Sequence, residues 1–281
     1  MKCHPSNSCV NTEMSGIDIK ITNKCNANCF YCIEKGGYEP EEKDVKSLIE
    51  ATNILDYKNV LVLGGEPLMC EHLEEYLKGI QGKNIYLTTN GMLLNAQNAE
   101  MLSRHLTGIN ISMHYYTEAR NAELYSVPSD KYSFSGICEA IPIFNKNRVP
   151  VRINCNLMQG AIDSQKDIQK MVYFAEFMGA DSIRFSELQN CEKRYVDATK
   201  LIGGLNSDPY CQGCEKEVHK DENITVFVKI TCHRVNKRKP LVDDPLFTFA
   251  SRRVIYPNGE TKKAWANSSG SDSCHGRSGC W

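Results

Sequence analysis

Six short apolar runs, each rich in β-branched residues, recur through the first two thirds of the chain. Longer segments with helical spacing of apolar residues separate them, such as residues 41–55 and 163–179. Strands that alternate with helices predict parallel βαβ units. Six such units predict an α/β fold, a partial (β/α)₆ TIM-like barrel with its chemistry at the carboxyl ends of the strands. The predicted strands are residues 16–22, 59–63, 84–89, 108–113, 149–157 and 181–188.

The composition changes after about residue 190. Cysteine, lysine and arginine become more frequent from residue 211, and helical periodicity fades. Residues 224–232 and 252–265 have the pattern of strands, and the second segment contains an Asn-Gly pair that is typical of a tight turn. We therefore predict three parts: an N-terminal extension (1–14), the barrel (15–190) and a small β-rich iron–sulfur module (191–281).

The charge balance of the chain is that of a soluble globular protein. Its 281 residues carry a formal net charge of −1, and 24% of them are charged. No run approaches the roughly 20 apolar residues of a transmembrane helix, and the polar start lacks the apolar core of a secretory signal. We expect a cytoplasmic protein without a membrane partner. Basic runs at residues 233–239 and 251–253 are interpreted as solvated surface or as phosphate or leader-peptide sites, and nucleic acid is not an expected partner.

Fourteen cysteines are many for a chain in a reducing compartment, where they indicate metal or redox chemistry rather than disulfides. Cys25, Cys29 and Cys32 lie within nine residues, directly after the first predicted strand. A structural zinc site normally has four protein ligands, whereas three thiolates can hold a cubane iron–sulfur cluster and leave one iron open. We interpret the motif as an iron–sulfur site, with zinc or a redox pair as alternatives.

Small polar residues follow the predicted strands. Gly64, Gly65 and Glu66 come after the second strand, where glycines let the backbone approach a ligand and the carboxylate would accept hydrogen bonds from an ammonium group. The next three strands end in residues 88–91, 112–114 and 154–156. Each segment alone is compatible with a loop cap, but together they fit one elongated polar ligand.

The motifs CNANCFYC and GGEP, in this βα-repeat context, resemble the radical S-adenosylmethionine (radical SAM) superfamily over about residues 15–190. Within it, the segments LTTNGMLL, INISM and RINCNLMQG are most similar to the molybdenum-cofactor GTP cyclase family. The resemblance implies that Cys25, Cys29 and Cys32 bind a [4Fe–4S] cluster whose fourth iron is occupied by S-adenosyl-L-methionine (SAM). It also implies reductive cleavage of SAM to a 5′-deoxyadenosyl radical that abstracts hydrogen from the substrate, with an electron donor such as flavodoxin or ferredoxin.

The same resemblance implies roles for other residues. Tyr31 would contact adenine, the Gly65 region the methionine part, and Ser112 and Asn154 the ribose or carboxylate of SAM. The predicted cofactor contacts are Tyr31, Gly64, Gly65, Glu66, Thr88, Asn90, Ser112, Asn154 and Arg184. Asp18, His114 and Arg152 are predicted substrate contacts.

A second group of cysteines lies in the C-terminal part. Cys211, Cys214 and Cys232 have the spacing of a metal site, and Cys191, Cys274 or Cys280 would supply a further ligand. We interpret them as ligands of a second iron–sulfur cluster, a [4Fe–4S] cluster in a twitch-like or SPASM-like module of the kind that many radical SAM enzymes carry. A zinc knuckle satisfies the same spacing.

The chain departs from GTP cyclases at the positions that bind the triphosphate. That family has arginines on the first strand, before GGEP and after the auxiliary CxxC motif, where this chain has Asp18, Leu61 and residues 215–218 (EKEV). Only Arg152, where the family carries a lysine, keeps its charge, and the family's terminal double glycine is absent. A triphosphate needs several cations, and an inward Asp18 would repel it.

We therefore predict a radical SAM enzyme that acts on a peptide or an amine-bearing small molecule, in a biosynthetic or peptide-maturation pathway. The alternatives are a nucleotide-modifying homologue and, from another class, a zinc-stabilised binding protein. Asp18 has its own alternative, in which it faces outward or pairs with Lys20 or Arg152.

Overall fold

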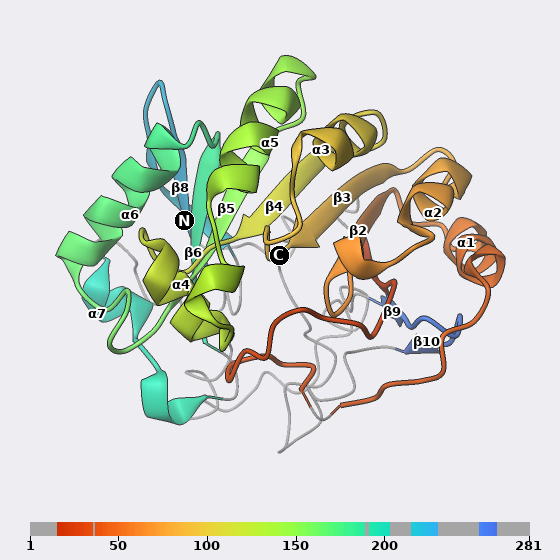
Figure 1. Ribbon diagram of the computed structural model, residues 1–281, viewed down its shortest axis with the longest axis horizontal. Helices are drawn as coiled ribbons and strands as arrows, with labels where there is room; N and C mark the ends of the chain where they lie inside the picture. The colour runs from red at the N-terminus through yellow and green to blue at the C-terminus, as the bar shows by residue number, and fades with distance from the viewer. Residues whose placement is uncertain (1–15, 36, 189–190, 203–214, 230–252, 263–281) are drawn as a thin grey trace, which may run out of the picture.

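The computed structural model describes residues 16–35, 37–188, 191–202, 215–229 and 253–262. These residues form one sheet of ten strands in the order β10-β9-β1-β2-β3-β4-β5-β6-β8-β7. The helices lie along one side of the curved sheet, and the other side is concave (Figure 1). This arrangement is the predicted mixed α/β fold, a parallel sheet with helices that is consistent with a partial TIM-like barrel.

The six predicted strands are all present, and they run parallel to one another. β5 begins later than predicted, after Pro150, a residue that has no N–H to donate to a neighbouring strand. The bounds are β1 Gly16–Lys20, β2 Asn59–Leu63, β3 Asn84–Thr89, β4 Gly108–Ser112, β5 Val151–Leu157 and β6 Ser182–Glu187.

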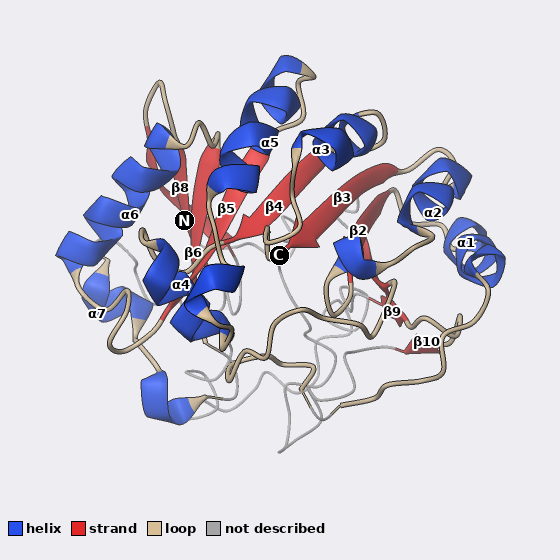
Figure 2. Cartoon of the chain, viewed as in Figure 1, coloured by secondary structure: helices blue, strands red, loops and turns tan. Residues whose placement is uncertain are grey.

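Helices fill the connections between these strands (Figure 2). Side-chain caps fix where two of them begin: Asp44 accepts a hydrogen bond from the N–H of Lys46 before α1, and Ser164 accepts one from Asp167 before α6. The helices are α1 Val45–Ile54, α2 Leu73–Gly79, α3 Ala96–Ser103, α4 Glu118–Tyr125, α5 Ser135–Lys146, α6 Gln165–Phe177 and α7 Ala198–Leu201. No helix of the described ranges is long and apolar enough to cross a membrane.

The pleat of the strands divides the sheet into two faces. Ile17 and Ile19 belong to the large core between sheet and helices. Asp18, between them in sequence, is in register with Leu61 and Val254, which belong to a separate cluster on the concave face. Because neighbours in register point the same way, Asp18 faces inward and not outward.

Segments from the C-terminal part extend the sheet at both edges. β8 (Thr225–Lys229) pairs parallel with β6 and antiparallel with β7 (Glu215–Lys220). At the other edge, β9 (Arg253–Ile255) pairs parallel with β1 and forms a hairpin with β10 (Thr261–Lys262). Gly259 has φ +78° in the turn, so the predicted Asn-Gly turn is confirmed.

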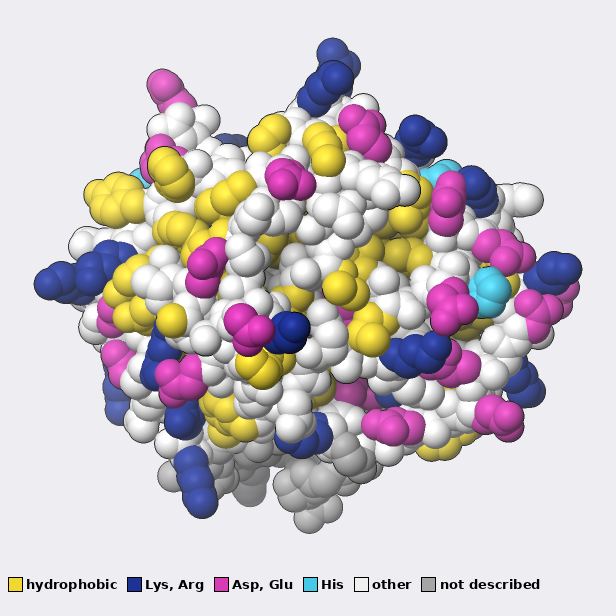
Figure 3. Space-filling model, viewed as in Figure 1, with side chains coloured by type: hydrophobic (Ala, Val, Ile, Leu, Met, Phe, Trp, Pro, Cys, Tyr) yellow, Lys and Arg dark blue, Asp and Glu magenta, His cyan; other side chains and the backbone are white. Residues whose placement is uncertain are grey.

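The division into three parts stays a prediction. Several predicted features lie outside the described residues: the extension over residues 1–14 and the ligands Cys211, Cys214, Cys232, Cys274 and Cys280. On the face drawn in Figure 3, basic and acidic side chains are interspersed rather than gathered by sign.

Candidate active site

A cavity of about 260 Å³ lies at the carboxyl ends of the strands. Its wall includes the three cysteines of the motif and all nine predicted cofactor contacts, together with His114. Of the predicted substrate contacts, Asp18 and Arg152 are not in this wall. The fold therefore gathers residues from the ends of β2 to β6, from a further strand that ends at Lys229, and from the cysteine loop around one cavity, although Cys25 and Lys229 are 204 positions apart in the sequence.

Backbone hydrogen bonds hold the cysteine loop against the glycines that follow β2. The N–H of Gly65 donates to Thr22 and that of Glu66 to Lys24, each at 2.8 Å. A Cβ atom at Gly65 would lie 2.3 Å from the carbonyl oxygen of Lys24. Only glycine allows this approach, which explains the residue type at that position.

The environment of the thiols suits a metal centre that carries several thiolates. Cys25 and Cys32 are exposed and Cys29 is half-buried. Burial raises the pKa of Cys29 to about 12, and burial also raises the pKa of Cys25. Isolated thiolates are therefore unfavourable here, and a cationic centre would stabilise them. Among the described residues, no three His, Cys, Asp or Glu side chains are placed to hold a single metal ion; in a cubane cluster each thiolate binds a different iron.

Glu66 fixes the ends of β2 and β3 to each other. Its Oε1 accepts hydrogen bonds from the Thr89 hydroxyl at 2.6 Å and the Leu68 N–H at 3.1 Å, and its Oε2 accepts one from the Asn90 N–H at 2.7 Å. The carboxylate is 1% exposed and burial raises its pKa. Since Oε2 keeps one acceptor position, Glu66 can still receive one ammonium hydrogen from a ligand in the cavity.

Asn90 ties the cysteine loop to β3. Its Nδ2 donates to Asn26 Oδ1 at 2.7 Å, and its Oδ1 accepts from the N–H of Met92 at 3.0 Å. Asn26 lies between the first two cysteines of the motif. The amide predicted to contact the cofactor thus also holds the loop that carries the thiols.

His114 is packed among aromatic rings at the end of β4. Its ring lies edge-on to Tyr31, with centroids 5.1 Å apart, and 5.4 Å from the ring of Tyr125. Its Nδ1 accepts a hydrogen bond from the N–H of Asn156 at 3.1 Å. Burial lowers the pKa of His114 to about 3, so the ring is neutral near pH 7.

The part of the cavity wall formed by β5 has a hydrogen-bond acceptor without a donor. Asn154 Oδ1 is buried and, within the described ranges, receives no hydrogen bond. Ser112 is its neighbour in register on β4, and Arg184 is its neighbour on β6. A buried amide oxygen without a donor is rare in folded proteins, so this wall fits a ligand with hydroxyl or ammonium groups.

Comparison with known proteins identifies the family. Residues 19–172 match the family model described as the Radical SAM superfamily. The chain belongs to the radical SAM superfamily. It is an enzyme, so the zinc-stabilised binding protein considered above is excluded. Members of this family use a [4Fe–4S] cluster and SAM, which when bound together supply a carbon radical for hydrogen abstraction.

The relatives of this radical SAM enzyme include GTP cyclases. The GTP 3′,8-cyclase of Aliarcobacter butzleri is 29% identical over 202 residues, which are 68% of this chain and 59% of the relative. A probable GTP 3′,8-cyclase of Methanococcus aeolicus is 27% identical over 255 residues, 83% of this chain and 75% of the relative. The chain therefore spans about three fifths to three quarters of the length of these relatives.

Solved structures share the fold. SuiB of Streptococcus suis bound to S-adenosylmethionine has a TM-score of 0.61 at 16% identity, over 88% of this chain and 59% of SuiB. SuiB bound to precursor peptide SuiA has a TM-score of 0.63 at 15% identity, over 92% of this chain and 61% of SuiB. At these identities the likeness concerns the fold alone.

The residues present fit the two cofactors of the family. Three thiols stand in one loop, the Gly65 backbone approaches that loop closely, and Asn154 offers an unused acceptor inside the cavity. Cys25, Cys29 and Cys32 would hold the cluster, and the walls formed by Glu66 and Asn154 would hold SAM beside it.

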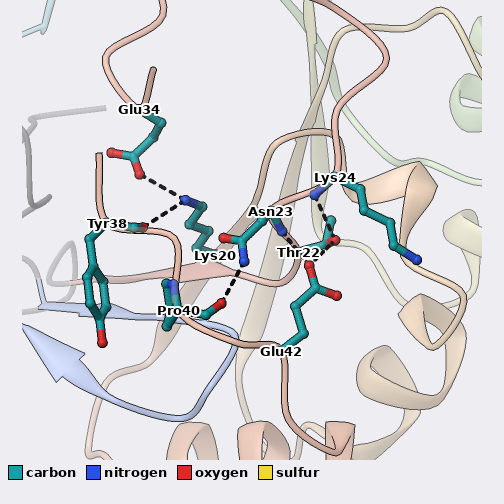
Figure 4. A network of polar contacts seen from close by, with 8 residues as sticks. All are labelled: Lys20, Thr22, Asn23, Lys24, Glu34, Tyr38, Pro40 and Glu42. Atoms are coloured by element: carbon teal, nitrogen blue, oxygen red, sulfur yellow. Dashed lines mark hydrogen bonds and ion pairs between the residues drawn. The ribbon is translucent and has the colours of Figure 1, made fainter. Parts of the chain in front are cut away.

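A polar network holds the segment after the cysteine loop along β1 (Figure 4). Lys20 Nζ donates to Glu34 Oε2 at 3.2 Å and to the carbonyl of Tyr38 at 3.3 Å. Glu42 accepts hydrogen bonds from the Thr22 hydroxyl at 2.7 Å and the Asn23 N–H at 2.6 Å. Lys20 is therefore paired with Glu34. The alternative in which Lys20 pairs with Asp18 is wrong.

Arg152 lies outside the cavity wall. Its guanidinium stacks on the ring of Phe227 at 4.8 Å, and its Nε donates to Ser182 Oγ at 3.4 Å. Ser182 lies on the neighbouring strand β6, and Phe227 lies on β8, the next strand beyond it. Arg152 thus contributes to the packing of the concave face below the strand ends.

The cavity wall also contains residues that are not among the predicted cofactor contacts, including Tyr125, Glu187 and Lys229. Tyr125 lies at the end of α4, where its hydroxyl donates to the carbonyl of Ser112 at 2.6 Å and its own carbonyl accepts from the N–H of Asn28. Lys229 ends β8, a strand that the sequence assigned to a separate module. The sequence favours Glu187, near the end of the sixth predicted strand, as an acid beside Asp18 that suits a cationic substrate, whereas the only signal for Lys229 is its place within the predicted strand 224–232.

The low pKa of His114 predicts a loss of stability in acid. Unfolding restores the usual pKa near 6.5, so the unfolded chain binds a proton that the folded chain excludes down to about pH 3. This loss in the free energy of unfolding begins as the pH falls below 6.5 and grows toward pH 3, where it is on the order of 5 kcal/mol at about 1.4 kcal/mol per pH unit. Denaturant unfolding between pH 7 and pH 4 should show a steeper fall in the wild type than in His114→Gln, and equal slopes would contradict the prediction.

Proposed function

We propose that this radical SAM enzyme abstracts hydrogen from a peptide or an amine-bearing small molecule, in a biosynthetic or peptide-maturation pathway. One observation carries the proposal. Asp18 and Leu61 occupy positions where GTP cyclases have arginines, and the two are register neighbours on the inward face, both buried. A buried inward carboxylate disfavours a polyphosphate and favours a cationic group.

The charges in the cavity wall support this substrate class. Glu187 is 2% exposed, and its Oε1 accepts a hydrogen bond from the N–H of Ala198 at 2.9 Å. Arg184 and Lys229 are buried in the same wall. A cavity that combines acids with cations suits the ammonium and carboxylate groups of amino acids better than a uniformly anionic ligand. SuiB, which has this fold, has been crystallised with its precursor peptide.

A nucleotide substrate is the second candidate. The relatives with 24–29% identity are GTP cyclases, and Arg184 and Lys229 are cations in the cavity wall. Against it, Arg152 is stacked on Phe227 outside that wall. The other predicted phosphate ligands, Arg234 and Arg252, lie outside the described residues, as does the side chain of Arg253.

Substrate-dependent formation of 5′-deoxyadenosine separates the two candidates. The reconstituted full chain, with SAM and a chemical reductant under anaerobic conditions, would be offered GTP on one side and a library of peptides and free amino acids on the other. We expect turnover above the substrate-free background with a member of the library and none with GTP. Turnover with GTP and with no library member would overturn the proposal.

The variants Asp18→Asn and Leu61→Ala serve as a matched pair for the role of the carboxylate. They change neighbouring positions on the inward face, but only the first removes a charge. We expect kcat/KM for the amine substrate to fall by tenfold or more in Asp18→Asn and by less in Leu61→Ala. Equal effects in both variants would show that packing, not charge, matters at this position.

We further propose that Cys211, Cys214 and Cys232 hold a second iron–sulfur cluster, with Cys191, Cys274 or Cys280 as a fourth ligand, and that a flavodoxin or ferredoxin supplies electrons. Of these cysteines only Cys191 is described, half-buried against the apolar cluster of Leu124, Met158, Ala161 and Leu188. Iron analysis after anaerobic reconstitution tests the second cluster, because one cluster gives about four irons per chain and two give about eight.

A further inference from the structure

Residues 37–44, which form neither helix nor strand, hold the entry of the cysteine loop (Figure 4). Glu42 Oε1 accepts hydrogen bonds from the Thr22 hydroxyl at 2.7 Å and from the N–H of Asn23 at 2.6 Å. The carbonyl of Pro40 accepts a third bond, from Asn23 Nδ2 at 2.8 Å. The segment 37–44 therefore binds two residues that lead from β1 toward the first cysteine.

A second support for this entry is the glycine segment after β2. The carbonyl of Thr22 accepts a hydrogen bond from the N–H of Gly65, and the carbonyl of Lys24 accepts one from the next residue, Glu66. Thr22 is fully buried, and its hydroxyl also accepts from the N–H of Lys24 at 3.1 Å. Among the described residues, Glu42 is the one acceptor to which that hydroxyl donates, so the glycine segment cannot replace it.

The hairpin of β9 and β10 fixes the segment 37–44 near both of its ends. At one end, the ring of Tyr38 packs edge-on against Tyr256, with centroids 5.0 Å apart, and its hydroxyl donates to Glu260. Near the other end, the N–H of Lys43 donates to the carbonyl of Pro257 at 3.1 Å. Because β9 pairs with β1, the hairpin itself is part of the sheet. The segment is therefore held from a distant part of the chain, since 222 positions separate Tyr38 from Glu260.

We propose that Glu42 is a positioning residue for the N-terminal cluster, which holds the cysteine loop in place, and that the hairpin of β9 and β10 fixes Glu42. Glu42 is exposed and is not in the cavity wall, so it is placed to act through Thr22 and Asn23 rather than by contact with a ligand. Local opening of a loop exposes its metal ligands, and metal is lost from the open form. Hydrogen bonds to the carboxylate make this opening rarer and thereby slow the loss of iron.

Three variants separate this role from a loss of overall stability. Glu42→Ala removes the acceptor of both donors, whereas Glu42→Gln keeps an amide oxygen that can accept in its place. Asn53→Ala is the matched control, because the Asn53 side chain also has two hydrogen bonds. It donates to the carbonyl of Gly79 at 2.9 Å and accepts from the N–H of Gln81 at 3.2 Å, outside the cavity wall.

The test measures how fast the chelator EDTA removes iron from the reconstituted full chain, under anaerobic conditions and without SAM or substrate, together with the melting temperature. The relevant phase of iron loss is the one that is missing when Cys25, Cys29 and Cys32 are replaced by alanine. We expect this phase to be about five- to tenfold faster than wild type in Glu42→Ala, and within about twofold of wild type in Glu42→Gln. Asn53→Ala should melt at a lower temperature and lose iron at the wild-type rate.

A double variant tests the contribution of the hairpin. Tyr38→Ala removes the ring and the hydroxyl that join the segment 37–44 to β9 and β10, so it should also speed the loss of iron. Because both substitutions act through the same bonds to the loop entry, Tyr38→Ala with Glu42→Ala should be at most about twofold faster than Glu42→Ala alone. Single effects that multiply would show that the hairpin does not act through Glu42.

A contribution to overall stability alone would give a different pattern. If Glu42→Ala loses iron at the wild-type rate, or if Asn53→Ala loses it as fast as Glu42→Ala, the proposal is wrong. If Glu42→Gln is as fast as Glu42→Ala, the acceptor oxygen is not what holds the loop. None of these results bears on the peptide or amine substrate, because substrate is absent from the measurement.

Discussion

Replacing Cys25, Cys29 and Cys32 together by alanine should remove about four irons per chain and abolish SAM cleavage. The three thiols stand in one loop at the wall of the cavity, and the backbone of Gly65 and Glu66 holds that loop. Without them the cluster has no ligands near the predicted SAM site, and no electron reaches SAM. The loss should be complete rather than partial, measured as 5′-deoxyadenosine formed under anaerobic conditions with dithionite.

Cys138→Ser is the matched control for this variant. Cys138 is exposed on α5, on the helix-covered side of the sheet, and is not in the cavity wall. We expect its iron content and SAM cleavage to equal those of the wild type. If the triple variant still cleaved SAM, the assignment of the three cysteines as cluster ligands would be wrong.

The second large effect is expected from Gly65→Ala. The added Cβ would lie 2.3 Å from the carbonyl oxygen of Lys24 and 2.7 Å from that of Asn23. Both atoms are backbone, so the cysteine loop itself must move to make room. Overpacking of this kind costs about 1–3 kcal/mol, and SAM affinity should fall tenfold or more because the loop and the glycine wall shift together.

Two other glycines show whether the effect is specific. Gly64→Ala meets the carbonyl oxygen of Thr22 at 3.0 Å, a milder contact that should give a smaller loss. Gly82→Ala has open space around the new methyl group but keeps a φ of +65°, so it should lower stability alone. SAM affinities in the order Gly82→Ala, Gly64→Ala, Gly65→Ala, strongest to weakest, are expected. An unchanged affinity in Gly65→Ala would contradict the tight approach of the two loops.

The fold and the place of the site were predictable because both follow from local patterns. Six apolar, β-branched runs predicted six parallel strands, and β2 and β3 have the predicted bounds. Strand pleating also predicted that Asp18 would point inward if it replaced an inward arginine, and its register with Leu61 places it there. These features depend on residues close in sequence or on a period of two.

The hydrogen bonds inside the site were not predictable, because they join distant segments. Glu66 and Asn90 were predicted to contact the cofactor, and nothing in their motifs indicates that one bonds the end of β3 and the other bonds Asn26. The pairing of β8 with β6 was missed for the same reason. A strand's own sequence shows its period but not its neighbour in the sheet, so Lys229 was not placed in the cavity.

The most direct test of an open iron in the N-terminal cluster is the electron paramagnetic resonance spectrum of the reduced full chain, recorded with and without SAM. A cluster held by Cys25, Cys29 and Cys32 would have one iron open to SAM in the cavity. The signal of that cluster should therefore change when SAM is added, and this change should be lost together with the signal in the triple cysteine variant. A cluster signal that is identical with and without SAM, while SAM is shown to bind, would contradict it.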